Sequence, residues 1–190
     1  MAIAHILKPA PEGAAQLFLL FCDAGQSWQE MTPLGEALGK AFGSAAIVVV
    51  QGPHAVGEDS CWLVPAGEMQ AGETQAGVAD TPMEGRALLT AWEDEALAGA
   101  IEAALPGCIG SIRNWQAQMK VLPEATALIG VGEGATMALA AAMASAGDGH
   151  PVCGRVSTVG GRFGPVPDAV SPTLVLHLVH GKADQSVHFR

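Results

Sequence analysis

A strand, a tight turn and a helix of small residues follow one another in residues 125–143, and this segment constrains the fold more than any other. The first part is apolar and ends at Gly130, and the helical part is rich in alanine. Gly130, Gly132 and Gly134 alternate through the turn between them. Glycine permits a left-handed backbone and the close approach of a helix to a strand. We therefore expect a sharp junction with Gly132 at its tip and a helix beginning near Glu133.

The length and composition favour one well-packed α/β domain over residues 1–190. Hydrophobic residues make up 49% of the chain and charged residues 15%. The net charge of −10, without a cluster of Lys or Arg, argues against nucleic acid and anionic membranes as partners. The four scattered cysteines form no Cys-x-x-Cys pair, so we expect reduced thiols, no metal and no cofactor. We see no signal peptide and no apolar run of membrane length, which favours the cytoplasm.

Apolar segments of strand length alternate with helical ones along the chain. This alternation predicts βαβ units and a mainly parallel sheet with helices on both faces. Residues 45–50 are β-branched or alanine throughout and give the clearest central strand. The other expected strands are 2–7, 16–22, 125–130, 155–159 and 173–179, with helices over 29–42, over 88–121 with a break at Pro106-Gly107, and after Gly132. Residues 51–86 keep no period and are expected to form a long irregular connection of a kind that is usually functional.

Four blocks of sequence, one of them the glycine turn described above, resemble the phospholipase/carboxylesterase family of α/β-hydrolases. They follow one another along the chain as they do in that family, which includes the acyl-protein thioesterase-like esterases. The turn at Gly130, Gly132 and Gly134 is similar to the family's nucleophile elbow, Gly-x-Ser-x-Gly. The resemblance implies a three-layer α/β-hydrolase fold for nearly the whole chain. The other three blocks are the strand and loop 17–25, the segment from Gln51-Gly-Pro to Trp62, and His177-Leu-Val-His-Gly-Lys-Ala-Asp184.

The resemblance also implies a role for each position of the site. Gly132 stands at the position of the serine nucleophile and Asp184 at that of the triad acid. Ala24 and Glu133 stand at the positions whose backbone N–H groups form the oxyanion hole. The family's catalytic histidine follows a further helix and strand, which we expect to be missing because the sequence stops at Arg190.

The chemistry of this chain departs from the family pattern. Glycine at position 132 has no side chain to attack an acyl carbon, and Cys22-Asp23 replaces the His-Gly that opens the family's oxyanion loop. Cys22 is one alternative nucleophile, although a buried structural cysteine is the more common case. His180 is one alternative base, although the resemblance gives it a place in a turn beside Asp184.

Three functions remain open on the sequence alone. The first is an esterase homologue that is catalytically silent, with a pocket for a small ester or acyl ligand. The second is an active hydrolase of small esters or thioesters that uses a cysteine nucleophile or a site completed by further C-terminal residues. The third is a non-enzymatic binding or assembly module. An open sheet edge is prone to pairing, so a homodimer fits the first and third functions.

Overall fold

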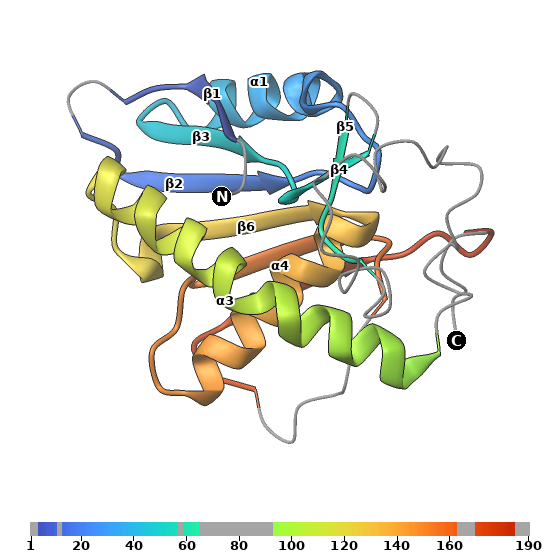
Figure 1. Cartoon of the computed structure of the whole chain (residues 1–190). Helices are drawn as coiled ribbons and strands as arrows, with labels where there is room; N and C mark the ends of the chain where they lie inside the picture. The colour runs from blue at the N-terminus through green and yellow to red at the C-terminus, as the bar shows by residue number, and fades with distance from the viewer. Residues whose placement is uncertain (1–3, 11–12, 57–58, 65–92, 163–169, 185–190) are drawn as a thin grey trace.

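The computed structural model describes residues 4–10, 13–56, 59–64, 93–162 and 170–184 (Figure 1). Two 3₁₀ helices, Trp28–Met31 and Pro123–Ala125, precede α1 and β6. The remaining elements in chain order are β1 (Ala4–Lys8), β2 (Gln16–Phe21), α1 (Thr32–Ala41), β3 (Ala45–Val50), β4 (His54–Val56), β5 (Asp59–Cys61), α3 (Asp94–Met119), β6 (Thr126–Val131), α4 (Gly132–Gly147), β7 (Arg155–Val159) and β8 (Val175–Val179).

In the described part of the chain, six strands form one sheet in the order β1-β3-β2-β6-β7-β8. β1 runs antiparallel to β3, and every other neighbouring pair is parallel. From β2 the chain first adds β3 on one side and later adds β6 on the other. Loops that leave two such strands diverge, and the crevice between them is where open α/β sheets place ligands. The topology therefore marks the carboxyl ends of β2 and β6, at Phe21 and Val131, as the expected site.

The helices cover the sheet in two layers, which gives the expected α/β-hydrolase-like sandwich. On one face α3 and α4 pack together over residues such as Leu19, Val48 and Leu128. On the other face α1 packs over β1 and β3, and Ile47 is buried there (Figure 1). The alternation of side chains along each strand explains why uninterrupted apolar runs such as β3 are buried on both faces.

The structure agrees with the predicted strands within a few residues and corrects one predicted helix. The strand predicted over residues 45–50 is β3 with the same bounds. The break expected at Pro106-Gly107 is wrong, because α3 runs through Pro106 from Asp94 to Met119. Proline has no N–H group, so the carbonyl group of Glu102, four residues before Pro106, has no helical hydrogen-bond donor. Both residues lie on the exposed side of α3, where water can bind this carbonyl group. The part of the predicted helix before residue 93 lies outside the described residues.

The segment predicted to be an irregular connection contains a short hairpin. β4 pairs antiparallel with β5, with His54 opposite Cys61. Trp62 follows this hairpin and packs its ring against Phe21 of β2, with ring centroids 5.2 Å apart. The hairpin is thereby held against the central strand next to the crevice. Residues 57–58 and 65–86 of this segment lie outside the described residues.

One exposed apolar edge and one apolar helix stand out in the described part. β8 forms one outer edge of the sheet, and Leu178 and Val179 are 53% and 56% exposed. Of the described helices, α3 is long and apolar enough to cross a membrane by length and composition alone. In this fold Leu97 and Ile112 of α3 are buried in the core over the sheet.

Candidate active site at the ends of β2 and β6

The junction of β6 and α4 has the predicted elbow geometry. β6 ends at Val131 and α4 begins at Gly132, whose φ of +52° is a left-handed conformation that favours glycine. Gly134 packs so closely that an added Cβ would collide with the backbone carbonyl groups of Phe21 and Cys22. The glycines are needed because strand β2 and the first turn of α4 meet here without intervening side chains.

The carboxylate of Asp23 lies where a side chain at position 132 would project. A Cβ added to Gly132 would overlap the carboxyl carbon and both oxygens of Asp23. Asp23 Oδ1 accepts hydrogen bonds from the backbone N–H groups of Ala24, at 2.8 Å, and Glu133, at 2.7 Å. These are the two N–H groups that the sequence assigned to an oxyanion hole, and the structure brings them together on one oxygen. A carboxylate of the protein itself therefore occupies that position.

Opposing effects act on the ionisation of Asp23. Burial raises the pKa of this carboxyl group above its ordinary value, and the negative charge of Asp184 also raises it. The N–H groups of Glu133 and Ala24 lower the pKa because they stabilise the carboxylate, but burial is the largest effect. The raised pKa means that the folded protein holds a proton on Asp23 more strongly than the unfolded chain does.

The loop that carries Asp23 is fixed by a tight turn and by the hairpin. Within the turn, Gln26 N donates to Asp23 O, Asp23 N donates to the Gln26 side chain at 3.0 Å, and Gly25 has a φ of +68°. Gly25 N also donates to Ser60 O of β5 at 2.9 Å. The position of the Asp23 carboxylate is thus set by backbone contacts on both sides of the loop.

Glu133 contributes its backbone to the site and its side chain to the core. The side chain is only 4% exposed and accepts hydrogen bonds from the backbone N–H groups of Trp62 and, at 3.2 Å, Leu63. The glutamate therefore ties the segment after β5 to the start of α4.

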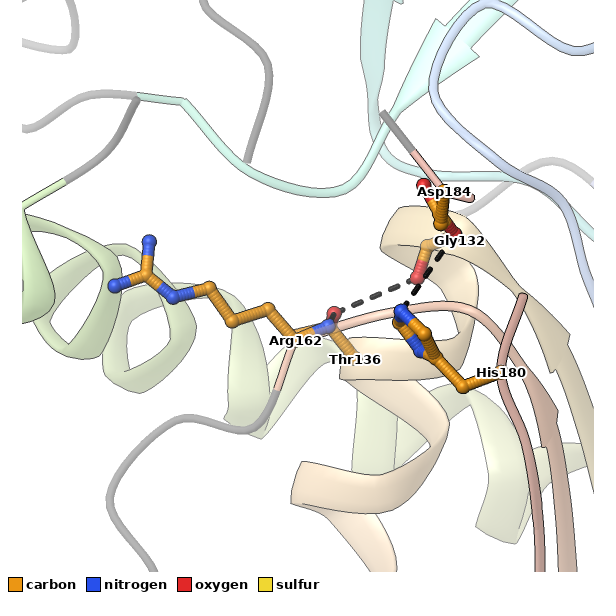
Figure 2. A network of polar contacts seen from close by, with 5 residues as sticks. All are labelled: Gly132, Thr136, Arg162, His180 and Asp184. Atoms are coloured by element: carbon orange, nitrogen blue, oxygen red, sulfur yellow. Dashed lines mark hydrogen bonds and ion pairs between the residues drawn. The ribbon is translucent and has the colours of Figure 1, made fainter. Parts of the chain in front are cut away.

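Asp184 and His180 lie beside Gly132 at the end of β8 (Figure 2). His180 Nε2 is 3.8 Å from Asp184 Oδ2, which is an ion pair when the imidazole is protonated. Asp184 Oδ2 also lies close to Gly160, since it would be 3.4 Å from a Cβ added there. The structure therefore gathers Asp184, His180 and Asp23 around the elbow, and no serine or cysteine among the described residues places its side chain at the elbow itself.

The first turn of α4 is tied to the loop after β7. Thr136 Oγ1 accepts a hydrogen bond from Arg162 N at 2.9 Å and contacts Gly132 O at 3.4 Å (Figure 2). The Arg162 side chain points the other way and pairs with Asp94 at the start of α3. Arg162 therefore connects the loop after β7 to both α4 and α3, and its guanidinium group is directed away from Gly132.

Cys22 does not face the crevice as a reactive thiol. Its side chain is buried under α1 in the cluster that includes Met31, and burial raises the pKa of the thiol to about 12. The neighbouring charges of Glu30 and Asp23 raise that pKa further. A thiol with this pKa supplies almost no thiolate at neutral pH.

Comparisons with known proteins show which proteins the chain is similar to. No family model matches the chain. The esterase YpfH of Escherichia coli is 29% identical over 181 residues, which cover 95% of this chain and 67% of that protein. The chain is a homologue of this esterase. Among solved structures, esterase PE8 is similar with a TM-score of 0.71 and 19% identity, covering 98% of this chain and 78% of that one. Acyl-protein thioesterase 2 of Zea mays has a TM-score of 0.58 and 16% identity, covering 99% and 79%.

Sequence reasoning about this esterase homologue missed the most informative side chain of the site. It treated Asp23 only as a departure from the family loop, because nothing local shows where the carboxylate points. The signal available was the pairing of a glycine at the nucleophile position with an acidic residue in the oxyanion loop. The contacts of the Glu133 side chain with Trp62 and Leu63 were also missed, since they join residues 70 and more positions apart.

Proposed function

We propose that this carboxylesterase homologue does not hydrolyse carboxylic esters or thioesters. The observation that carries the proposal is the contact of Asp23 Oδ1 with the N–H groups of both Ala24 and Glu133. Ester hydrolysis places a developing oxyanion on such N–H groups. Here they are occupied by an oxygen of the protein, and the charge of an ionised Asp23 would repel a second anion.

The arrangement of the other polar groups supports the same conclusion. Gly132 provides no nucleophile, and His180 has Asp184 as a neighbour but no serine or cysteine at the elbow to deprotonate. A serine-type mechanism needs a nucleophile, a base within reach of it and a group that orients the base. In the described residues only the acid and its histidine neighbour are present.

The alternative of a cysteine nucleophile has little physical support. Cys22 is 1% exposed, and its raised pKa leaves the thiol protonated at neutral pH. Cys61 is fully buried, and its thiol contacts Leu63 O at 3.6 Å. We retain this alternative only as an outcome that the following experiment can detect.

The test is an assay of the full chain against p-nitrophenyl acetate and butyrate and a short-chain acyl thioester, with fluorophosphonate labelling in parallel. We expect rates equal to buffer and no covalent label. Turnover that survives purification and disappears in Cys22→Ala would overturn the proposal and identify a thiol mechanism. Turnover that disappears in Asp184→Asn and not in Cys22→Ala would instead indicate a triad completed from elsewhere.

A role in assembly is the second candidate, and the exposed edge of the sheet favours it. β8 leaves its outer backbone edge unpaired in the described part of the chain, and Leu178 and Val179 are exposed there. Pairing of two β8 strands would cover this edge in a homodimer. Sedimentation of the chain and of Leu178→Lys tests this candidate: a dimer that the substitution dissociates supports it, and a monomer at all concentrations rejects it.

We also propose a cytoplasmic location, to be checked by cell fractionation.

A further inference from the structure

The position of the Asp23 carboxylate suggests a reaction other than ester hydrolysis. In the fold of this homologue the nucleophile projects from the elbow residue, and Gly132 leaves that space free of its own side chain. The carboxyl group of Asp23 fills the same space from the end of β2. A carboxylate is itself an established enzymatic nucleophile. The nucleophile position is therefore occupied, although by a residue from a different strand.

The two oxygens of Asp23 have different surroundings. Oδ1 accepts hydrogen bonds from Ala24 N and Glu133 N. Among the described residues Oδ2 accepts no hydrogen bond, and the side chain is not among the fully buried ones. One oxygen is thus fixed, and the other retains lone pairs that can attack an electrophile.

We propose that Asp23 is a carboxylate nucleophile for substitution at saturated carbon, in substrates that carry a leaving group such as a halide or a sulfonate. Oδ2 bonds to the carbon, the bond to the leaving group breaks, and the leaving group departs with the electron pair. Asp23 becomes an alkyl ester. No oxyanion forms in this step, so occupation of the N–H pair by Oδ1 does not obstruct it.

The same N–H pair then assists release of the product. Water adds to the carboxyl carbon of the Asp23 ester, and the negative charge of the tetrahedral intermediate falls on Oδ1, which already faces Ala24 N and Glu133 N. The proton of the water passes to Asp184, which lies beside the elbow: a Cβ added to Gly160 would be 3.4 Å from Asp184 Oδ2 and 3.9 Å from Gly132 N. Collapse of the intermediate passes a proton to the departing alkoxide, which yields the alcohol and restores Asp23. The sum is hydrolysis of the alkyl compound to an alcohol, the free leaving-group anion and a proton.

The experiment uses the full chain and 1-bromopropane as the probe, followed by proteolysis and mass spectrometry. We expect a propyl ester on Asp23, with a modified fraction on the order of tenfold or more above that of exposed Asp148 in the same sample, because a positioned group reacts faster than a free one. In ¹⁸O-labelled water, excess probe should also place ¹⁸O in the Asp23 carboxyl group. Esterification should increase with pH as Asp23 ionises.

Two variants sharpen the result. Asp23→Asn should abolish the label while keeping an oxygen acceptor for the two N–H groups, and Asp148→Asn should leave the label at position 23 unchanged. Equal labelling of Asp23 and Asp148 in the wild-type chain would overturn the proposal, whether or not Asp23→Asn folds. Labelling confined to cysteine would overturn it as well. Ester hydrolysis in the earlier assay would reject the proposed silence toward esters, whereas the absence of both the propyl ester and ¹⁸O from Asp23 rejects only the present inference.

Discussion

Asp23 Oδ1 lies 2.7 Å from the backbone nitrogen of Glu133, although 110 positions separate the two residues in the sequence. This hydrogen bond joins the loop after β2 to the first turn of α4 across the topological switch point of the sheet. It places a permanent acid on the two N–H groups that the family resemblance assigns to the oxyanion hole. The predictions below follow from this contact and from the close packing around it.

Gly132→Ser alone should not create an esterase. The backbone at position 132 has a φ of +52°, and an added side chain overlaps the Asp23 carboxylate, so Asp23 must move for the serine to fit. We expect a loss of about 1–3 kcal/mol in unfolding free energy from this strain. Among the described residues the imidazole of His180 pairs with Asp184, and we expect it not to activate the new hydroxyl group; such help is worth roughly 10²–10⁴-fold. Urea unfolding, p-nitrophenyl ester hydrolysis and fluorophosphonate labelling measure these effects. Stoichiometric labelling with rapid turnover would contradict the prediction and point to His180 as a base.

Asp23→Asn should remove a pH dependence of stability. The folded-state pKa of Asp23 is raised from 3.8, so the folded chain binds its proton more strongly than the unfolded chain does. The stabilisation from that proton is complete below the unfolded pKa and is lost as pH rises through the folded pKa. The wild-type chain should therefore lose stability relative to Asp23→Asn as pH rises above about 4.

Urea unfolding from pH 3 to pH 8 measures this difference. Asp148→Asn, at an exposed position after α4, is the matched control and should follow the wild-type curve. A stability difference between wild type and Asp23→Asn that stays constant with pH would show that folding does not shift the pKa of Asp23, and a change in the opposite direction would show that the surroundings favour the charged form; either result contradicts the prediction.

Glu133→Ala should destabilise the fold more than Glu133→Gln. The alanine variant leaves the N–H groups of Trp62 and Leu63 without their carboxylate acceptor inside the protein, which costs about 1–3 kcal/mol. Glutamine keeps an oxygen acceptor and should lose less. Glu102→Ala, on the exposed side of α3, should change the unfolding free energy little. If Glu133→Ala and Glu102→Ala unfold at the same urea concentration, the buried contacts of Glu133 contribute nothing to stability.

Gly134→Ala and Gly110→Ala should change stability in opposite directions. A Cβ at position 134 collides with backbone carbonyl groups of β2 and of Cys22, which cannot move without separating α4 from the strand. We expect a loss of about 1–3 kcal/mol. A Cβ at position 110 meets no neighbour in the interior of α3, and alanine should stabilise that helix by roughly 0.5–1 kcal/mol. Thermal unfolding of both variants measures the effects, and stabilisation by Gly134→Ala would contradict the close packing at the elbow.

The elements most accurately predicted from the sequence are those specified by their own residues. β3 follows from six consecutive Ala, Ile and Val residues, and the junction at Gly132 follows from a strand pattern that gives way to a helix pattern across alternating glycines. The continuous α3 could not be predicted with the same success. Proline at position 106 favours a break locally, and only the packing of Leu97 and Ile112 on the sheet stabilises both halves as one helix.

The sequence by itself determined the α/β architecture, because hydrophobic periodicity and glycine placement are local properties of the chain. It also determined that position 132 carries no nucleophile. Only the tertiary structure decided what occupies the resulting space. The direction of the Asp23 carboxylate depends on N–H groups from two distant segments and on a turn held by Ser60 of the hairpin. Contacts of this kind arise when the strand ends converge at one edge of the sheet, and no pattern within either segment encodes them.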